Sequence, residues 1–85
     1  MPFYVYIIQS LRDESYYVGT TGDLSNRIER HNQGRSTFTK PKRPWKLVYS
    51  EECPDRSTAM KKEYAIKRRK SKDYILNLIN TTKPD

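Results

Sequence analysis

The stretch from Tyr16 to Gly34 reads YYVGTTGDLSNRIERHNQG, and it holds the chain's single histidine and all three of its glycines. Its first residues are aromatic and β-branched, which favours a strand. Asp23 then supplies a good N-cap for a helix over residues 24–32, and the glycine at its end is a natural stop signal. We therefore predict a strand followed directly by a helix, with Gly19 letting the backbone turn between them.

The residues before this stretch predict its partner strand. Phe3 to Ile8 is a run of aromatic and β-branched side chains that is apolar on both faces, as in a central strand. With the polar residues 10–14 as a turn, the two strands should form an antiparallel hairpin. An even-length connection would place Tyr6 and Tyr17 on the same face. Packing in the core and a shared polar site are both open roles for these tyrosines.

The remaining residues complete a small α+β domain. We expect a basic loop over residues 35–44, a third strand over Trp45–Ser50, and a second helix that is capped by Asp55 or Ser57 and ends near Lys70. A third helix should follow, with these residues on its buried side: Tyr74, Ile75, Leu78 and Ile79. The predicted order is β-β-α-β-α-α, a three-stranded, largely antiparallel sheet flanked by helices. Residues 1–80 are expected to form the single domain and residues 81–85 a disordered tail.

The chain is strongly basic, with 17 lysines and arginines against 10 acids and a net charge of +7. Such an excess on one small domain indicates an anionic partner, with nucleic acid as the leading candidate, although charge also serves solubility. The basic residues gather in two segments, 35–46 and 61–72. The candidate nucleic-acid-binding residues within them are Arg35, Lys40, Lys42, Arg43, Lys61, Lys62 and Lys67.

Cysteine content and hydropathy exclude several classes of protein. One cysteine, Cys53, cannot form a disulfide framework, and with one histidine it cannot build an ordinary structural zinc site. No apolar run approaches the length of a membrane span. We therefore expect a soluble cytoplasmic protein with no membrane partner.

The first predicted helix carries two polar residues on its inner face. Leu24, Arg27, Ile28 and His31 fall within one arc of about 100°. Arg27 and His31 therefore flank the apolar stripe and face the body of the protein. They are either boundary residues satisfied by their neighbours or members of a site.

The second predicted helix raises a similar question about Glu63. Ala59, Glu63 and Ile66 share one face, and Met60 is expected to widen it. A carboxylate near the centre of an apolar face needs compensation, because burying it unpaired costs several kcal/mol. An ion pair, for example with Arg27, and a hard divalent cation are both open interpretations.

These residues together resemble the GIY-YIG nuclease superfamily over nearly the whole chain. The resemblance rests on Tyr4-Val5-Tyr6, on Tyr17-Val18-Gly19 eleven residues later, on the helix with Arg27 and His31, and on Glu63. The similarity is greatest to small, single-domain bacterial members, and it extends to the N-terminal domain of the repair endonuclease UvrC. Two departures stand out, since Tyr4 replaces the first glycine of the first motif and Thr20 replaces a lysine found in some relatives.

The resemblance implies a function and a set of roles. Tyr6, Tyr17 and His31 would be the candidate general bases, Arg27 would contact the phosphodiester, and Glu63 would hold a single Mg²⁺ or Mn²⁺ ion. The implied activity is metal-dependent endonuclease cleavage of DNA in repair or processing. Branched, flapped or damaged DNA is the implied substrate, and a partner protein is one possible source of specificity. A nucleic-acid-binding module without catalysis is the alternative, and a basic protein that binds an acidic partner is a third reading.

Overall fold

The computed structural model describes residues 2–81, apart from the side chain of Thr81. Its elements follow the predicted order β-β-α-β-α-α, with one additional short 3₁₀ turn. They are β1 (Phe3–Ser10), β2 (Tyr16–Thr21), α1 (Leu24–Asn32), η1 (Lys40–Lys42), β3 (Trp45–Cys53), α2 (Arg56–Arg69) and α3 (Lys72–Thr81). Residues 82–85 of the predicted tail lie outside the described residues, whereas Thr81 is the last residue of α3.

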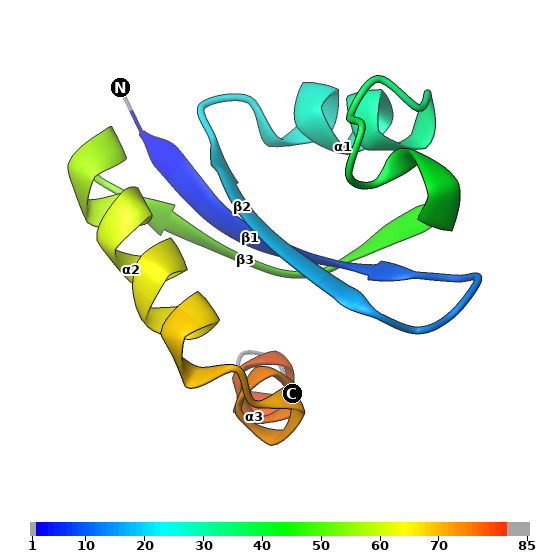
Figure 1. The fold of residues 1–85 in the computed structure, drawn as a ribbon. Coiled ribbons are helices and arrows are strands. Elements are labelled where there is room, and N and C mark those ends of the chain that lie inside the picture. The colour runs from blue at the N-terminus through cyan, green and yellow to red at the C-terminus, as the bar shows by residue number, and fades with distance from the viewer. Residues whose placement is uncertain (1, 82–85) are drawn as a thin grey trace.

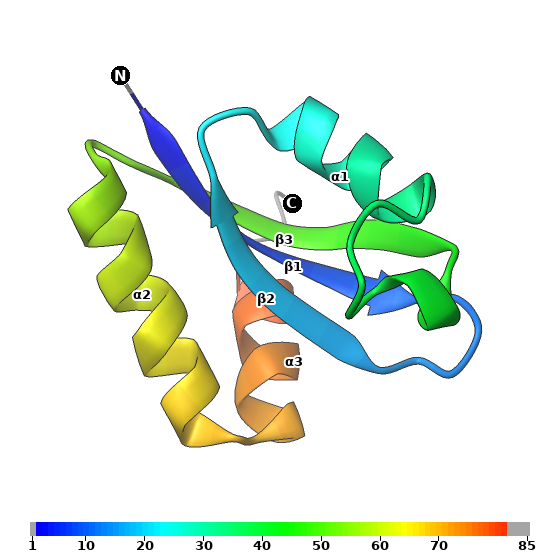
Figure 2. The same ribbon diagram turned by 45° about the horizontal axis from the view of Figure 1, so that its top comes forward.

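The three strands form one antiparallel sheet in the order β2-β1-β3, which confirms β1 as the central strand. Figures 1 and 2 show α1 over one face of this sheet, with α2 and α3 on the opposite side. β2 is therefore an edge strand, and α2 runs beside it. This placement lets side chains from α2 reach around the edge of β2 toward the face that α1 covers.

Each face of the sheet has its own apolar cluster. The α2/α3 face buries Val5, Ile7, Val18, Tyr49 and Ile66, and the four predicted apolar residues of α3 pack against this cluster. The α1 face buries Tyr6, Ile8 and Trp45, and it is completed by Tyr17, Leu24 and Ile28. Because β1 is apolar on both faces, it contributes to both clusters, as its sequence predicts.

The helix boundaries follow from local capping. The carboxylate of Asp23 accepts a hydrogen bond from the backbone N–H of Asn26, and Asp55, rather than Ser57, caps α2 through the N–H of Thr58. Both bonds satisfy N–H groups that the first turn of a helix leaves free. Gly34 follows α1 with a φ of +79°, a conformation that glycine adopts without strain.

Three predictions about local structure were wrong. Gly19 lies inside β2, and the chain turns toward α1 only after Thr21. The basic loop contains the turn η1, and Met60 is largely exposed instead of widening the buried face of α2. Within residues 2–81, no helix has both the length and the apolar character needed to cross a membrane.

Candidate active site

At the candidate site, the ring of Tyr6 on β1 lies over the neighbouring strand β2. Tyr6 lies directly opposite Gly19 in the β1–β2 register. A Cβ atom on Gly19 would stand only 2.6 Å from the Tyr6 hydroxyl oxygen and 2.7 Å from Cζ of its ring. The missing side chain therefore lets the Tyr6 ring lie over β2. This close approach, and no turn, is what requires glycine at this position.

The Tyr6 hydroxyl leads into a buried chain of hydrogen bonds. It lies 2.8 Å from Nε2 of His31, and Nδ1 of His31 lies 2.8 Å from the Thr39 hydroxyl. The carbonyl of Thr39 in turn accepts a hydrogen bond from the Trp45 indole N–H at 2.8 Å. Either tautomer of neutral His31 satisfies both of its bonds. The ring is only 2% exposed, so both of its nitrogens are committed to protein partners.

Tyr17 stands on the same face as Tyr6, as the hairpin prediction required. Its ring packs edge-on against His31 at 5.3 Å between centroids and against Trp45 at 6.5 Å. Unlike Tyr6, which is 1% exposed, Tyr17 is only half-buried and lines an open cavity of about 240 Å³. Tyr17 is therefore the tyrosine that a molecule entering this cavity would meet.

The cavity is strongly basic. Its lining residues are Tyr17, Arg27, Arg30, His31, Arg35 and Ser36. No acidic side chain belongs to this set, so the cavity suits an anion. A half-buried guanidinium such as that of Arg27 offers a planar fork of donors that matches the non-bridging oxygens of a phosphate.

The environment keeps Tyr6 and His31 neutral. Burial raises the pKa of Tyr6 to about 12, and Tyr17 and Glu63 add to the rise, whereas the charge of Arg27 acts in the opposite direction. Burial also lowers the pKa of His31 below its ordinary 6.5, with Arg27 and Arg30 acting in the same direction. Near neutral pH the pair is therefore an uncharged hydrogen-bonded unit.

Glu63 reaches this region from α2. Its side chain is 21% exposed, so it is less buried than the helical pattern predicts, and it forms an ion pair at 2.7 Å with Lys67 one turn further along α2. Among the residues described, the ion-pair partner of Glu63 is thus Lys67 and not Arg27. The Lys67 ammonium also lies 5.7 Å from the centroid of the Tyr17 ring. Lys67 therefore stands between the carboxylate and the aromatic wall of the site.

The number of metal-binding side chains near one another limits the kind of metal site that the described residues can form. Residues 2–81 contain no group of three or more His, Cys, Asp or Glu side chains able to hold an ion together. A single carboxylate is nevertheless compatible with Mg²⁺, which commonly binds one or two carboxylates together with waters and substrate phosphate oxygens. Glu63 therefore fits a site that the substrate completes.

The seven candidate nucleic-acid-binding residues divide by position. Arg35 lines the cavity, Lys67 borders Tyr17, and Lys40 and Arg43 line a neighbouring surface cavity of about 540 Å³. Three others lie outside both cavities: Lys42 pairs with Asp13, Lys62 pairs with Glu51, and Lys61 borders an apolar groove on α2. The basic surface next to the site thus comes mainly from the segment that follows α1.

Some residues of the site were not predicted from the sequence. Thr39 is 1% exposed and links His31 to Trp45, but an isolated threonine in a basic loop gives no signal of such a role. Arg30 falls outside the inner arc of α1 that the sequence predicts, yet it lines the cavity. Asn32 holds the start of β3 through two side-chain hydrogen bonds: its Oδ1 accepts from the N–H of Trp45 at 2.6 Å, and its Nδ2 donates to the carbonyl of Trp45 at 3.0 Å.

A comparison with known protein families identifies the class to which the chain belongs. The GIY-YIG catalytic domain family matches residues 2–80, so the chain belongs to the GIY-YIG family. This domain has a nuclease-type fold, the family acts on DNA, and its nucleases generally use a divalent metal.

Within this family, the chain is similar to several UPF0213 proteins. The chain is 44% identical over 68 residues to the UPF0213 protein DP2720 of Desulfotalea psychrophila, a match that covers 78% of this chain and 61% of that protein. It is 43% identical over 65 residues to the UPF0213 protein SSP2268 of Staphylococcus saprophyticus, covering 75% and 78%. The solution NMR structure of the UPF0213 protein BH0048 from Bacillus halodurans matches with a TM-score of 0.61 and 32% identity, over 96% of this chain and 86% of that one.

Proposed function

We propose that this protein is a metal-dependent DNA endonuclease whose reaction takes place in the cavity beside Tyr17. The observation that carries the proposal is the meeting of Tyr17, Arg27 and the Tyr6–His31 pair at one basic cavity, with the Glu63 carboxylate approaching around the edge of β2. Phosphodiester hydrolysis needs an anion-binding group, a group that orients water, and charge neutralisation. The side chains at this cavity supply all three.

Arg27 is the phosphate-binding residue in this proposal. It lines the cavity from α1, where the cap at Asp23 fixes the start of the helix. Its guanidinium stays charged at every relevant pH and gives two parallel hydrogen bonds to a phosphate. Arg30 and Arg35 line the same cavity and add charge that favours entry of the DNA backbone.

Tyr17 is the residue that faces the attacking water. Both ring nitrogens of His31 are hydrogen-bonded to protein hydroxyls, those of Tyr6 and Thr39. Tyr17 is half-buried and lines the cavity, so its hydroxyl is the one that can contact water there. The Tyr6–His31–Thr39 chain has the role of positioning, because it holds the aromatic wall against which Tyr17 packs. In its deprotonated form Tyr17 would accept a proton from the attacking water, with Arg27 in the same cavity and Lys67 beside its ring.

Glu63 is the ligand for the divalent ion, which would neutralise charge on the phosphate and on the leaving oxygen when bound. Lys67 holds the same carboxylate, so metal and Lys67 compete for it. Because one carboxylate binds Mg²⁺ weakly by itself, we expect metal and DNA to bind cooperatively.

A second candidate function is DNA binding without cleavage, and two observations favour it. The Glu63 carboxylate is already engaged by Lys67, and Thr20 stands where some relatives have a lysine. In that case the basic cavity would bind DNA equally well in EDTA and with Mg²⁺.

A screen of nuclease activity tests the two candidates against each other. Labelled flaps, forks, nicked duplexes, single strands and intact duplexes are incubated with Mg²⁺, Mn²⁺ or EDTA, and gel shifts are run in parallel in EDTA. Metal-dependent cleavage of at least one substrate is expected. DNA binding with no cleavage under any condition would support the binding module, and neither binding nor cleavage would reject both.

A further inference from the structure

Phe38 is the most exposed of the large apolar side chains among residues 2–81, with 85% of its surface accessible. Other exposed residues of this kind, such as Tyr64 and Leu11, reach 63% and 57%. A phenylalanine contributes to folding by burial, so one held almost fully in solvent adds little stability through its ring. Because so little of the ring is covered by the protein, both of its faces are open to a ligand.

The backbone around Phe38 is held firmly in place. The N–H of Lys40 donates to the carbonyl of Ser36 at 2.9 Å, which closes a turn with Phe38 at its centre. Thr39, the next residue, is buried and bonded through its hydroxyl to His31 and through its carbonyl to Trp45. The exposed ring is thus carried on a turn that is fixed to the core of the candidate site.

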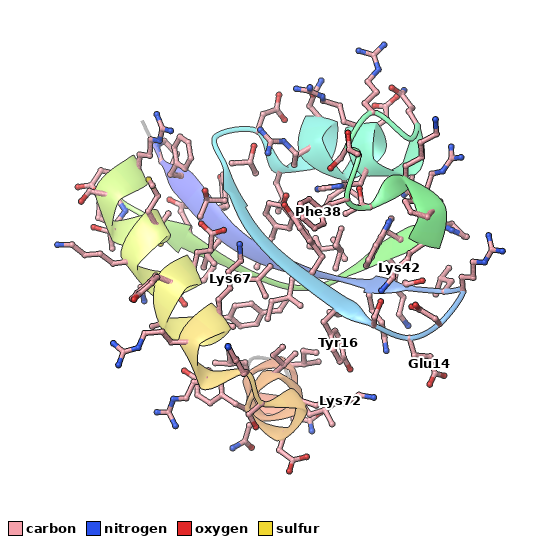
Figure 3. All side chains as sticks on the ribbon, in the orientation of Figure 1. Glu14, Tyr16, Phe38, Lys42, Lys67 and Lys72 are labelled. Carbon is pink, nitrogen blue, oxygen red and sulfur yellow. The ribbon has the colours of Figure 1, made fainter. Side chains whose placement is uncertain are left out.

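This turn also borders the basic cavity. Arg35 and Ser36 line the cavity, and Phe38 is only two residues further along the chain, a span of at most about 7 Å. That distance corresponds to about two base-pair steps along the axis of a duplex. In Figure 3, Phe38 lies on the side of β2 toward α1, and Lys67 lies on the side toward α2. The segment 35–46 that carries the ring has five basic residues and no acid.

We propose that Phe38 stacks on an unpaired base of the DNA strand whose phosphate enters the cavity, so that the substrate class is DNA with a single-stranded or frayed segment at the cleavage site. This inference rests on the proposed function and specifies its substrate. Aromatic rings that stack on bases beside a positively charged groove are the common means of binding single strands. Within a continuous duplex each base face is covered by its neighbours, so the ring has a partner only where a base is unstacked.

The surroundings of Phe38 favour a base over an apolar protein surface. Phe38 lies between Arg35 and Lys40 along the chain, next to residues that line the basic cavity, and no other large apolar side chain of segment 35–46 is exposed. An isolated ring in a basic setting matches a nucleobase attached to a phosphate backbone, whereas protein interfaces usually need a contiguous apolar core.

The test is a set of binding measurements in EDTA, in which metal-dependent cleavage cannot interfere. Fluorescence anisotropy is measured with a single strand, a fork, a 5′ flap and a blunt duplex, for the wild type, Phe38→Ala, Phe38→Trp and the control Leu76→Ala on α3. We expect the wild type to prefer DNA with unpaired bases. Phe38→Ala should lose about 5- to 150-fold in affinity for the unpaired substrates and little for the blunt duplex. Phe38→Trp and Leu76→Ala should bind like the wild type.

The salt dependence separates stacking from charge. Phe38→Ala should keep the wild-type slope of log affinity against log salt, whereas Arg35→Gln should reduce it by about 0.7 to 0.9. Equal binding of wild type and Phe38→Ala to every DNA would overturn the stacking proposal, leave the nuclease proposal standing, and direct attention to a protein partner. An equal loss on duplex and single strand would also overturn it. A wild type that neither binds nor cleaves any DNA would overturn both proposals.

Discussion

Replacing Gly19 by alanine is the substitution that bears most directly on how the fold forms the site. The new Cβ would stand 2.6 Å from Oη and 2.7 Å from Cζ of Tyr6, distances that real Cβ contacts essentially never show. The Tyr6 ring cannot move aside freely, because it is 1% exposed and its hydroxyl is hydrogen-bonded to His31. The clash must therefore shift the ring by most of an ångström or displace β2.

The expected cost has two parts. Overpacking a filled interior costs about 1–3 kcal/mol. Loss of the Tyr6–His31 hydrogen bond adds about 0.5–1.5 kcal/mol, so Gly19→Ala should lower the free energy of unfolding by about 1.5–4.5 kcal/mol. Gly22→Ala is the matched control, since its Cβ would come no closer than 3.2 Å to a carbon at the edge of the Phe3 ring. That variant should lose about 1 kcal/mol or less.

The assay is equilibrium unfolding in urea, followed by circular dichroism, for both variants and for Gly19→Ala combined with Tyr6→Phe. The double variant removes the atom in the closest contact but keeps the ring, so it should recover only part of the loss and show a coupling energy of at least about 0.5 kcal/mol. If Gly19→Ala is as stable as Gly22→Ala, or if the two substitutions are additive, the account of Tyr6 crossing β2 is wrong.

Three further predictions concern the site. Because the pKa of His31 is lowered in the folded protein, the unfolded chain binds a proton at this position more readily as the pH falls below about 6.5, and the free energy of unfolding should decline. Unfolding curves measured between pH 7 and 5 should show a smaller decline for His31→Gln than for the wild type. Lys67→Gln should increase the affinity of Glu63 for Mn²⁺ in a titration without DNA, and it should cost only about 0.3–0.5 kcal/mol of stability. An unchanged affinity would show that Lys67 and the metal ion do not compete for Glu63. Tyr17→Phe should slow cleavage about 10²- to 10⁴-fold with little change in stability, whereas Tyr6→Phe should cost about 1 kcal/mol of stability. If Tyr17→Phe cleaves at the wild-type rate, Tyr17 is not the general base.

Much of the fold could be predicted because the local signals agree with the tertiary structure. The apolar run of β1 is paired on both sides and packed on both faces, and the caps at Asp23 and Asp55 define where α1 and α2 begin. Tyr6 and Tyr17 share a face because an even number of residues separates the paired Gln9 and Tyr16, which is the condition under which the sequence predicted a shared face. Local propensity and side-chain periodicity carry this information within a few neighbouring residues.

What could not be predicted depends on contacts between distant residues. Trp45 and Tyr49 are four apart on β3 and would share a face of a regular strand, yet they pack on opposite faces. A bulge between the pairs Ile7–Tyr49 and Ile8–Leu47 shifts the register by one residue and reverses the direction of the side chains. No local pattern in the strand indicates this extra residue.

The partners of the site residues were hidden for the same reason. A helical pattern places Glu63 on the inner face of α2, but it cannot show that α2 lies beside the edge of β2, where Lys67 pairs with the carboxylate and reaches Tyr17. In the same way, glycine at position 19 is equally consistent with a turn and with a close approach by another side chain. Only the three-dimensional arrangement distinguishes these alternatives.

The most direct test of the central claim is the cleavage rate of Glu63→Gln compared with the wild type and with Glu51→Gln, on the best substrate from the screen and with Mg²⁺ or Mn²⁺. Glu51 is also paired with a lysine, Lys62, but it accepts a hydrogen bond from Tyr49, which packs on the sheet face opposite Tyr17, so its variant controls for the loss of an ion pair. We predict that Glu63→Gln folds and binds DNA in EDTA but shows no metal-dependent cleavage, while Glu51→Gln cleaves like the wild type. Cleavage by Glu63→Gln at the wild-type rate, or wild-type cleavage that persists in EDTA, would contradict the account.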